Sequence, residues 1–232
     1  GVQNTLIGGL AGDAMTTGDT NTFIGYQAAG DGNVTGDKNT AIGGNSGLNL
    51  TSGTENTFVG NNAGDATDDG SYNTAIGFEA LSANCGNTNV ACGYASLQAC
   101  TGTDNTAIGP ASGNTLSSGD MNTFVGHDSG RVMTTGSKNV ILGGYDGNEG
   151  GLDIRTSSNN IVLSDGDGNP RVNWGSGGQA QFRSTSSASS GALNSALISG
   201  DGLGATLNIF SARPNNDAYY NFVGSNVSNT VT

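Results

Sequence analysis

Basic residues are scarce in this chain of 232 residues, which has 7 Lys and Arg against 19 Asp and Glu and a formal net charge of −12. Nucleic acids are bound through basic surfaces, so this balance excludes a nucleic-acid-binding protein. The chain also has no polybasic segment and no apolar run of about 18 residues, and we expect neither a membrane-surface patch nor membrane insertion. Its three cysteines are too few for a disulfide framework and lack the spacing of a zinc site.

Helix-forming residues are the second shortage. Charged residues make up 11% of the chain, whereas glycine alone contributes 41 residues, and Asn, Thr and Ser are abundant. These residue types favour turns and strand edges, so we expect an all-β protein with almost no helix. Only 34% of the residues are hydrophobic, which leaves one chain little to bury. We therefore expect identical neighbouring chains to supply the missing apolar contacts.

What the chain has instead is a five-residue repeat, Asn-Thr-apolar-(Ile/Val)-Gly. Its copies begin at Asn4, Asn21, Asn39, Asn56, Asn73, Asn89, Asn105, Asn122 and Asn139. The steps between them are 16 to 18 residues, a period that indicates a solenoid. A glycine precedes each Asn by three residues, another follows it by four, and a small Ala or Ser follows by seven in the first eight copies. We predict a β-solenoid of about nine coils over residues 1–150, with two short strands and two glycine corners per coil, the glycine before the Asn having a positive φ.

The strand in each copy is apolar at its centre on both faces, which indicates burial on both. The Ile or Val position is regular, and we assign it to the interior of the coil, as for Ile24. The preceding position varies between Phe and Ala, as expected where large residues of one chain fill gaps left by small residues of another, and we assign it to contacts between copies, as for Phe23. The predicted core and interface residues are Phe23, Ile24, Ile42, Phe58, Val59, Ile76, Ile108, Phe124, Val125, Leu142 and Trp174.

The period breaks after Leu142. Residues 151–174 contain an imperfect tenth strand, an Asp/Gly turn and a second strand, and we predict a capping hairpin in which Trp174 plugs the end of the assembled core. Residues 175–232 are predicted to form a Gly/Ser-rich linker and a small β-module with strands at 205–210 and 219–223. Because Gly1 lies inside the first repeat, we expect the chain to be a segment of a longer polypeptide.

Three copies, at 39–43, 73–77 and 105–109, read Asn-Thr-Ala-Ile-Gly and resemble the head repeats of trimeric autotransporter adhesins. The stretch from Asn21 to Ala29, together with the Thr-Thr-Gly turn at 134–136, is still more similar to a repeat of phage tail fibres. The adhesin repeat has a shorter period, which favours the tail-fibre resemblance. The resemblance covers residues 1 to about 150 and implies a trimeric left-handed β-roll.

The resemblance implies a structural and adhesive function: a segment of a homotrimeric phage tail fibre or virion appendage that acts as a rigid spacer for attachment to a host receptor. The partners it implies are other tail or fibre proteins and a host surface polysaccharide or outer-membrane receptor, with the protein on the virion, outside the cell. A bacterial trimeric autotransporter adhesin head, at the bacterial cell surface, is the first alternative. A polysaccharide-depolymerising tailspike is the second; we expect no enzyme and no required cofactor.

Two patterns resemble sites for chemistry. Asp165, Asp167 and Asn169 have the alternating oxygen ligands of a calcium loop. Pro170 stands where an EF-hand needs glycine, and no Glu follows at the required distance, so we prefer a polar turn, with calcium as the alternative. The only histidine, His127, has no partner nucleophile in the repeat pattern, and we interpret it as a surface residue.

Tyr26, Phe78, Tyr94 and His127 occupy one column of the repeat, five residues after the Asn. Aromatic side chains on such an outer ridge can stack on sugar rings, or they can pack on the neighbouring coil. We prefer packing, because single exposed aromatic residues are common, and only unusual exposure would favour binding.

The three cysteines have different positions in the repeat. Cys92 replaces the Ile of its strand, and we predict a small buried hydrophobic residue. Cys85 and Cys100 lie near the same corner of successive coils, and the sequence allows a disulfide between them without deciding whether it forms.

Overall fold

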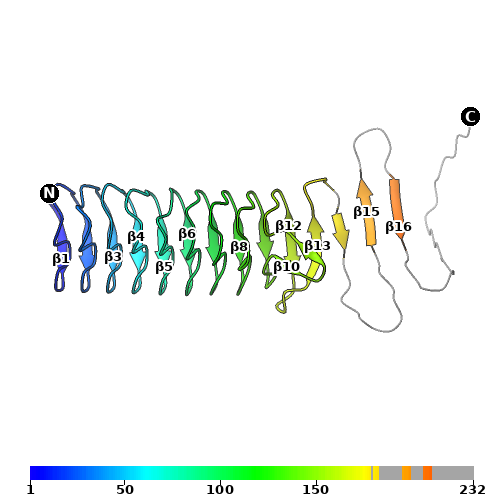
Figure 1. Cartoon of the computed structure of the whole chain (residues 1–232), viewed down its shortest axis with the longest axis horizontal. Helices are drawn as coiled ribbons and strands as arrows, with labels where there is room; N and C mark the ends of the chain where they lie inside the picture. Colours follow the sequence, from blue (N-terminus) through cyan, green and yellow to red (C-terminus); the bar gives the residue numbers. More distant parts are fainter. Residues whose placement is uncertain (179, 183–194, 200–205, 211–232) are drawn as a thin grey trace, which may run out of the picture.

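The computed structural model describes residues 1–178, 180–182, 195–199 and 206–210, and all regular structure in these residues is β. Each copy of the repeat forms one short strand, in the order β1 (Thr5–Ile7), β2 (Thr22–Ile24), β3 (Thr40–Ile42), β4 (Thr57–Val59), β5 (Thr74–Ile76), β6 (Val90–Cys92), β7 (Thr106–Ile108), β8 (Thr123–Val125) and β9 (Val140–Leu142). The remaining strands are β10 (Asn148–Glu149), β11 (Leu152–Asp153), β12 (Ile161–Ser164), β13 (Pro170–Trp174), β14 (Ala180–Phe182), β15 (Ser195–Ser199) and β16 (Thr206–Phe210). Figure 1 shows the coils stacked one after another into a rod, so the predicted all-β solenoid is confirmed. The described residues contain no helix long and apolar enough to cross a membrane.

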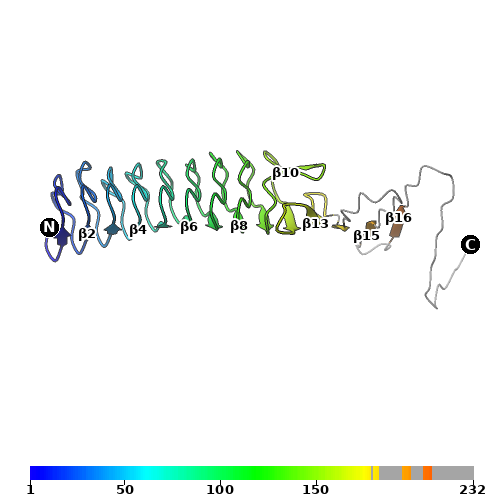
Figure 2. The ribbon, with the colours of Figure 1, turned by 90° about the horizontal axis from the view of Figure 1, so that it is seen from below.

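The strands of successive coils form one parallel sheet along the rod. Equivalent residues pair in register, as Thr22 does with Thr40 and then Thr57. The sheet continues through β12, which pairs parallel to β9, and then through β13 and β14, which pair antiparallel. In Figure 2 the strands lie along one side of the rod and the turn segments along the other.

Each coil has one strand rather than the two predicted. The segment that follows the strand instead passes through left-handed conformations, with φ of 52° at Gln27 and 49° at Ala29. Its backbone still bonds from coil to coil: the Gln27 N–H donates to the Gly9 carbonyl and the Ala29 N–H to the Ser46 carbonyl, both at 2.9 Å. The turn side of the solenoid is therefore held by hydrogen bonds between coils in the absence of a second sheet.

The assignment of the two strand faces from sequence is wrong and has to be reversed. The central residues, including Phe23, Phe58 and Phe124, are fully buried inside their own chain. The Ile or Val that follows points outward: Ile42 is 36% exposed and Ile108 44%. The same reversal applies to the predicted interior residues Ile24, Val59, Ile76, Val125 and Leu142, which are half-buried or exposed.

The variation between Phe and Ala is compensated within the chain, across neighbouring coils. The Phe58 ring lies over Gly47 and Gly64, where an added Cβ would approach ring carbons to 3.1 and 2.7 Å. In the coils centred on Ala75 and Ala91 the same space is filled from the turn side, by the buried Leu81 and Leu97. The coils centred on Ala41 and Ala107 have Gly47 and Gly113 at that turn position, and there the Phe58 and Phe124 rings of the next coil fill the space. The core is thus packed by complementary large and small side chains from the strand and the turn.

The repeated asparagine forms a buried ladder that sequence reasoning used only for alignment. Its members from Asn21 to Asn139 are at most 1% exposed. The Asn105 backbone N–H and side-chain Nδ2 both donate to Asn89 Oδ1, at 3.0 and 3.2 Å, and the same Nδ2 donates to the Gly119 carbonyl at 2.8 Å. Asn122 makes the same two bonds to Asn105 Oδ1, both at 3.0 Å. Each amide therefore joins its coil to the neighbouring coils.

The glycine three residues before each Asn has a different role from the one predicted. Gly36 does not adopt a positive φ; Lys38, two residues later, does, at 58°. A Cβ at Gly36 would overlap the carbonyl oxygen of Gly53 in the next coil. Close approach of the backbones of stacked coils is therefore what requires glycine here.

Residues beyond the ninth coil extend the sheet. Trp174 pairs with Ile161, and Ile161 pairs with Val140. Trp174 therefore continues the row of outward-facing residues to which Val140 belongs. The predicted strand at 205–210 corresponds to β16, whose partner is β15. The second strand predicted there, at 219–223, and most of the predicted linker lie outside the described residues.

Candidate functional site

The outward face of the sheet carries two columns of side chains, one on each side of the buried central residue. The first column consists of Thr5, Thr22, Thr40, Thr57, Thr74, Val90, Thr106, Thr123 and Val140. The second consists of Ile7, Ile24, Ile42, Val59, Ile76, Cys92, Ile108, Val125 and Leu142. We call these two columns the Thr/Ile face. They form an array in which each row is separated from the next by about 4.8 Å.

The Thr/Ile face has no charged side chain in any of its nine rows, in a chain with 19 acidic residues. Soluble monomers seldom leave a long contiguous apolar surface exposed, and larger patches mark interaction sites. Parallel sheets, in addition, are normally covered on both faces. The Thr/Ile face, uncharged and with aliphatic side chains in its second column, is therefore a candidate interaction surface.

The four residues predicted to form an aromatic ridge do share one outer column. Tyr26 and Tyr94 are 61% and 59% exposed, and Phe78 is 43% exposed. Phe78 and Tyr94 stack, with ring centroids 5.7 Å apart and planes inclined by 9°. The expected packing on the neighbouring coil is present at this pair, together with the exposure that favours binding.

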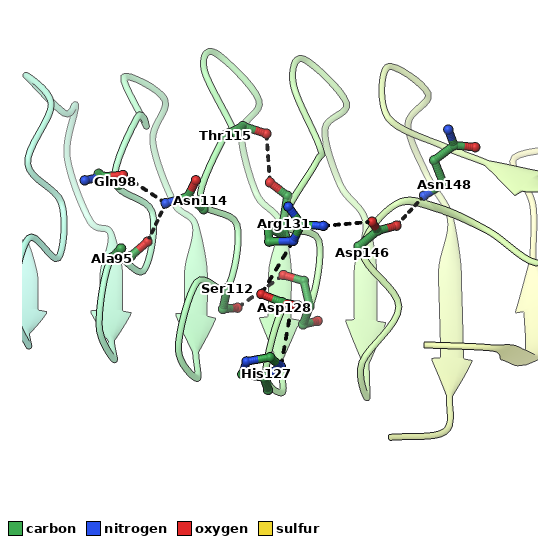
Figure 3. Close-up of polar contacts among 11 residues, drawn as sticks. Ala95, Gln98, Ser112, Asn114, Thr115, His127, Asp128, Arg131, Asp146 and Asn148 are labelled. Carbon is green, nitrogen blue, oxygen red and sulfur yellow. Dashed lines mark hydrogen bonds and ion pairs between the residues drawn. The ribbon is translucent and has the colours of Figure 1, made fainter. Parts of the chain in front are cut away.

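The coils of this ridge carry a polar ladder in two parts: one part joins the fifth, sixth and seventh coils, and the other holds Arg131 of the eighth coil between two carboxylates. Gln98 Nε2 donates to Glu79 Oε2 at 2.6 Å, and Asn114 Nδ2 donates to Gln98 Oε1 at 3.0 Å. Figure 3 shows the contact between Asn114 and Gln98 and, one coil further, Arg131 between Asp128 and Asp146. The arginine nitrogens lie 3.5 and 3.4 Å from the two carboxylates.

Sequence reasoning missed this ladder. Its members occupy the sixth and ninth positions after the repeated Asn, as Glu79 and Gln98 do, and these columns vary in residue type from coil to coil. No signal in single columns marks these residues, because an aromatic residue with a neighbouring amide and carboxylate also occurs in the second coil, at Tyr26, Gln27 and Asp31.

Asp165, Asp167 and Asn169 form a closed polar turn. The backbone N–H groups of Asp167 and Asn169 donate to Asp165 Oδ1 at 3.1 and 2.9 Å, and Arg171 donates to Asp165 Oδ2. Partial burial would raise the pKa of Asp165, but the hydrogen bonds from Asn169 and Arg171 outweigh it and hold that pKa below its usual value. Within the described residues no group of three or more His, Cys, Asp or Glu is placed to hold a metal ion.

His127 is an exposed residue beside a carboxylate. Its Nδ1 lies 3.6 Å from Asp128 Oδ2, and its side chain is 74% exposed. General-base catalysis needs a histidine held between an orienting group and a nucleophile. The contacts of His127 in the described chain supply only the carboxylate.

All three cysteines are free, so the disulfide between Cys85 and Cys100 that the sequence left open is absent. Both are buried in the core, and burial raises the pKa of the Cys85 thiol to about 11 and that of the Cys100 thiol to about 12. Cys92 differs from the prediction: it is half-buried and belongs to the Thr/Ile face.

Comparisons with protein-family models, with curated protein sequences and with solved structures give no match. The Thr/Ile face and the ridge with its polar ladder are therefore the features from which a function can be inferred.

Proposed function

We propose that the chain is a segment of a homotrimeric attachment fibre, a rigid spacer in a phage tail fibre or related virion appendage. The observation that carries the proposal is the Thr/Ile face, which is uncharged and partly exposed through nine consecutive coils. Association of copies through this face supplies the cover that its composition requires.

The regular register of the rod suits cyclic symmetry. When the symmetry axis runs parallel to the rod, each row of the face meets the same row of the other copies, as Thr106 and Ile108 of one chain would meet their equivalents. A face with a charge in any row would bring like charges together at that height, and this face has none. The resemblance to tail-fibre repeats supports three copies.

The remaining surface fits the role of a spacer. Coil-to-coil hydrogen bonds on both sides of the solenoid, together with the buried asparagine ladder, make a stiff rod. Three identical chains present identical outer surfaces, so weak contacts to a host polysaccharide or outer-membrane receptor multiply through effective concentration. Other tail or fibre proteins would join its ends, and its location would be the virion, outside the cell.

Cys92 provides a direct chemical test. In the assembly the Cys92 thiols of the copies lie at the same height on the shared face, and we expect a short bismaleimide to join two chains in high yield. Cys85 and Cys100 should stay unmodified, because both are buried and their raised pKa values leave little thiolate.

The matched control is Cys92→Ser, which should give no crosslinked product. Denaturing electrophoresis reads the result. In the unaltered chain, the bismaleimide could instead attach to Cys92 through one maleimide only and join no chains. That result would mean that the Thr/Ile face is not an interface between copies.

A further inference from the structure

We propose that the ridge and ladder of the fifth to eighth coils form a binding strip for an extended, uncharged glycan that lies along the rod. The strip consists of Phe78, Glu79, Tyr94, Gln98, Pro110, Asn114, His127, Asp128 and Arg131. The inference deepens the proposed attachment function, because it places receptor contacts on the shaft itself.

The ring residues of the strip offer apolar surface on four consecutive coils. Phe78, Tyr94, Pro110 and His127 hold the same position in their coils. In the four preceding coils that position is Gly9, Tyr26, Gly44 and Asn61. Phe78 and Tyr94 stack, so each ring covers only one face of the other. Their exposure leaves apolar ring surface for the C–H faces of pyranose rings, the part of a sugar that packs on aromatic side chains.

The polar residues of the strip are oriented before any ligand arrives. Gln98 is held by Glu79 on one side and Asn114 on the other, and Asn114 Nδ2 also donates to the Ala95 carbonyl at 3.1 Å. Amides and carboxylates have more hydrogen-bonding capacity than these contacts use, and a sugar hydroxyl can both donate and accept. Side chains fixed in this way lose little conformational entropy on binding.

The strip also has the period of a polysaccharide. Each coil contributes one ring residue and at least one polar residue, as Tyr94 and Gln98 do in the sixth coil. Successive coils are about 4.8 Å apart, so a ring residue and a polar residue recur at a spacing of the same order as the size of one sugar unit.

The negative charge of the strip and of the whole chain favours an uncharged glycan over an anionic one. The strip contains the carboxylates of Glu79 and Asp128, and the one guanidinium, that of Arg131, lies between Asp128 and Asp146. With a net charge of −12 on each chain, a polyanionic glycan would be repelled. An uncharged glycan meets the hydrogen-bonding groups without this repulsion.

The test is a binding screen of the assembled protein against immobilised oligosaccharides, followed by titration of the best ligand. The screen contains uncharged hexasaccharides of glucose, mannose and N-acetylglucosamine and an anionic uronic-acid hexasaccharide. We expect binding to at least one uncharged chain and none to the anionic chain.

Two variants locate the site. Tyr94→Ala should weaken binding about tenfold, because it removes one stacked ring. Tyr26→Ala is the matched control, with the same residue type, column and exposure but outside the strip, and it should change affinity by less than about twofold. Absence of binding to every uncharged chain, stronger binding to the uronic-acid chain, or equal loss in both variants would overturn the proposal.

The experiments distinguish failure of the glycan-binding proposal from failure of the proposed trimer. Sedimentation reports the number of chains, and Tyr94→Ala should leave that number unchanged. A trimer that binds no uncharged glycan refutes the strip alone, and a monomer that binds one through Tyr94 refutes the assembly alone. If Tyr94→Ala changes the number of chains, the ridge is a contact between copies and the glycan proposal is wrong.

Discussion

Replacing Asn105 with alanine is expected to lower the free energy of unfolding by about 2–6 kcal/mol, since two buried polar groups lose their partners at about 1–3 kcal/mol each. The groups are the Asn122 backbone N–H, which donates to Asn105 Oδ1, and the Gly119 carbonyl, which accepts from Asn105 Nδ2. Asn105 is fully buried, so both groups lie in the core, away from bulk water. Urea denaturation followed by circular dichroism measures the change.

Asn61→Ala is the matched control, because Asn61 is exposed on the outer ridge column. Its substitution should change the free energy of unfolding by no more than about 0.5 kcal/mol. Equal effects of the two substitutions would mean that the buried ladder contributes nothing specific to the stacking of coils.

Placing aspartate at both Ile76 and Ile108 is expected to abolish assembly. Both side chains point away from the core, with 43% and 44% of their surface exposed in one chain, so the fold of the coil does not require them to be apolar. In the proposed trimer each substitution would bury a carboxylate beside its own copies, which costs several kcal/mol per ion. Size-exclusion chromatography with light scattering should show the loss of the trimer.

Met121→Asp is the control for this pair. Met121 is also an exposed apolar residue, but it lies two residues before β8 and outside the Thr/Ile face. Its variant should assemble as the unaltered protein does. Unchanged assembly of the Ile76→Asp, Ile108→Asp protein would show that the copies do not associate through this face.

The coil stack was predictable from the sequence because a nine-fold repeat leaves few architectures. The orientation of each strand was not. Alternation separates Phe58 from Val59 but does not say which of them faces inward when both positions are apolar. The sequence holds a partial signal in the turn position of the same or the preceding coil: Gly64 and Gly47 accompany Phe58, whereas Leu97 accompanies Ala91. Only a large residue inside the coil would require this exchange of volume.

The predicted second strand is absent because the turn segment adopts left-handed backbone conformations, which the residue types there do not indicate. Left-handed conformations recur eight residues after the Asn, and at Leu81 and Leu97 they are adopted by leucine, with φ of 50° and 49°. Residues with side chains disfavour this region, so local preference gives no warning of it. Hydrogen bonds to the neighbouring coils, such as that of the Leu97 N–H to the Ser112 carbonyl at 2.9 Å, impose it.

The candidate surfaces were predictable in part. The column of Tyr26, Phe78, Tyr94 and His127 was found from spacing alone, because a repeat places equivalent residues above one another. The polar ladder beside it was not, since contacts such as that between Glu79 and Gln98 join different columns of neighbouring coils. Which residues of two different columns come close across neighbouring coils depends on the path of the turn, and the repeat pattern does not specify that path.

We propose that copies of this chain assemble through the Thr/Ile face. Sedimentation equilibrium of the purified protein tests this proposal most directly. We expect one species with three times the 23.0 kDa mass of a single chain. A stable, soluble species with the mass of one chain at micromolar concentration would contradict it.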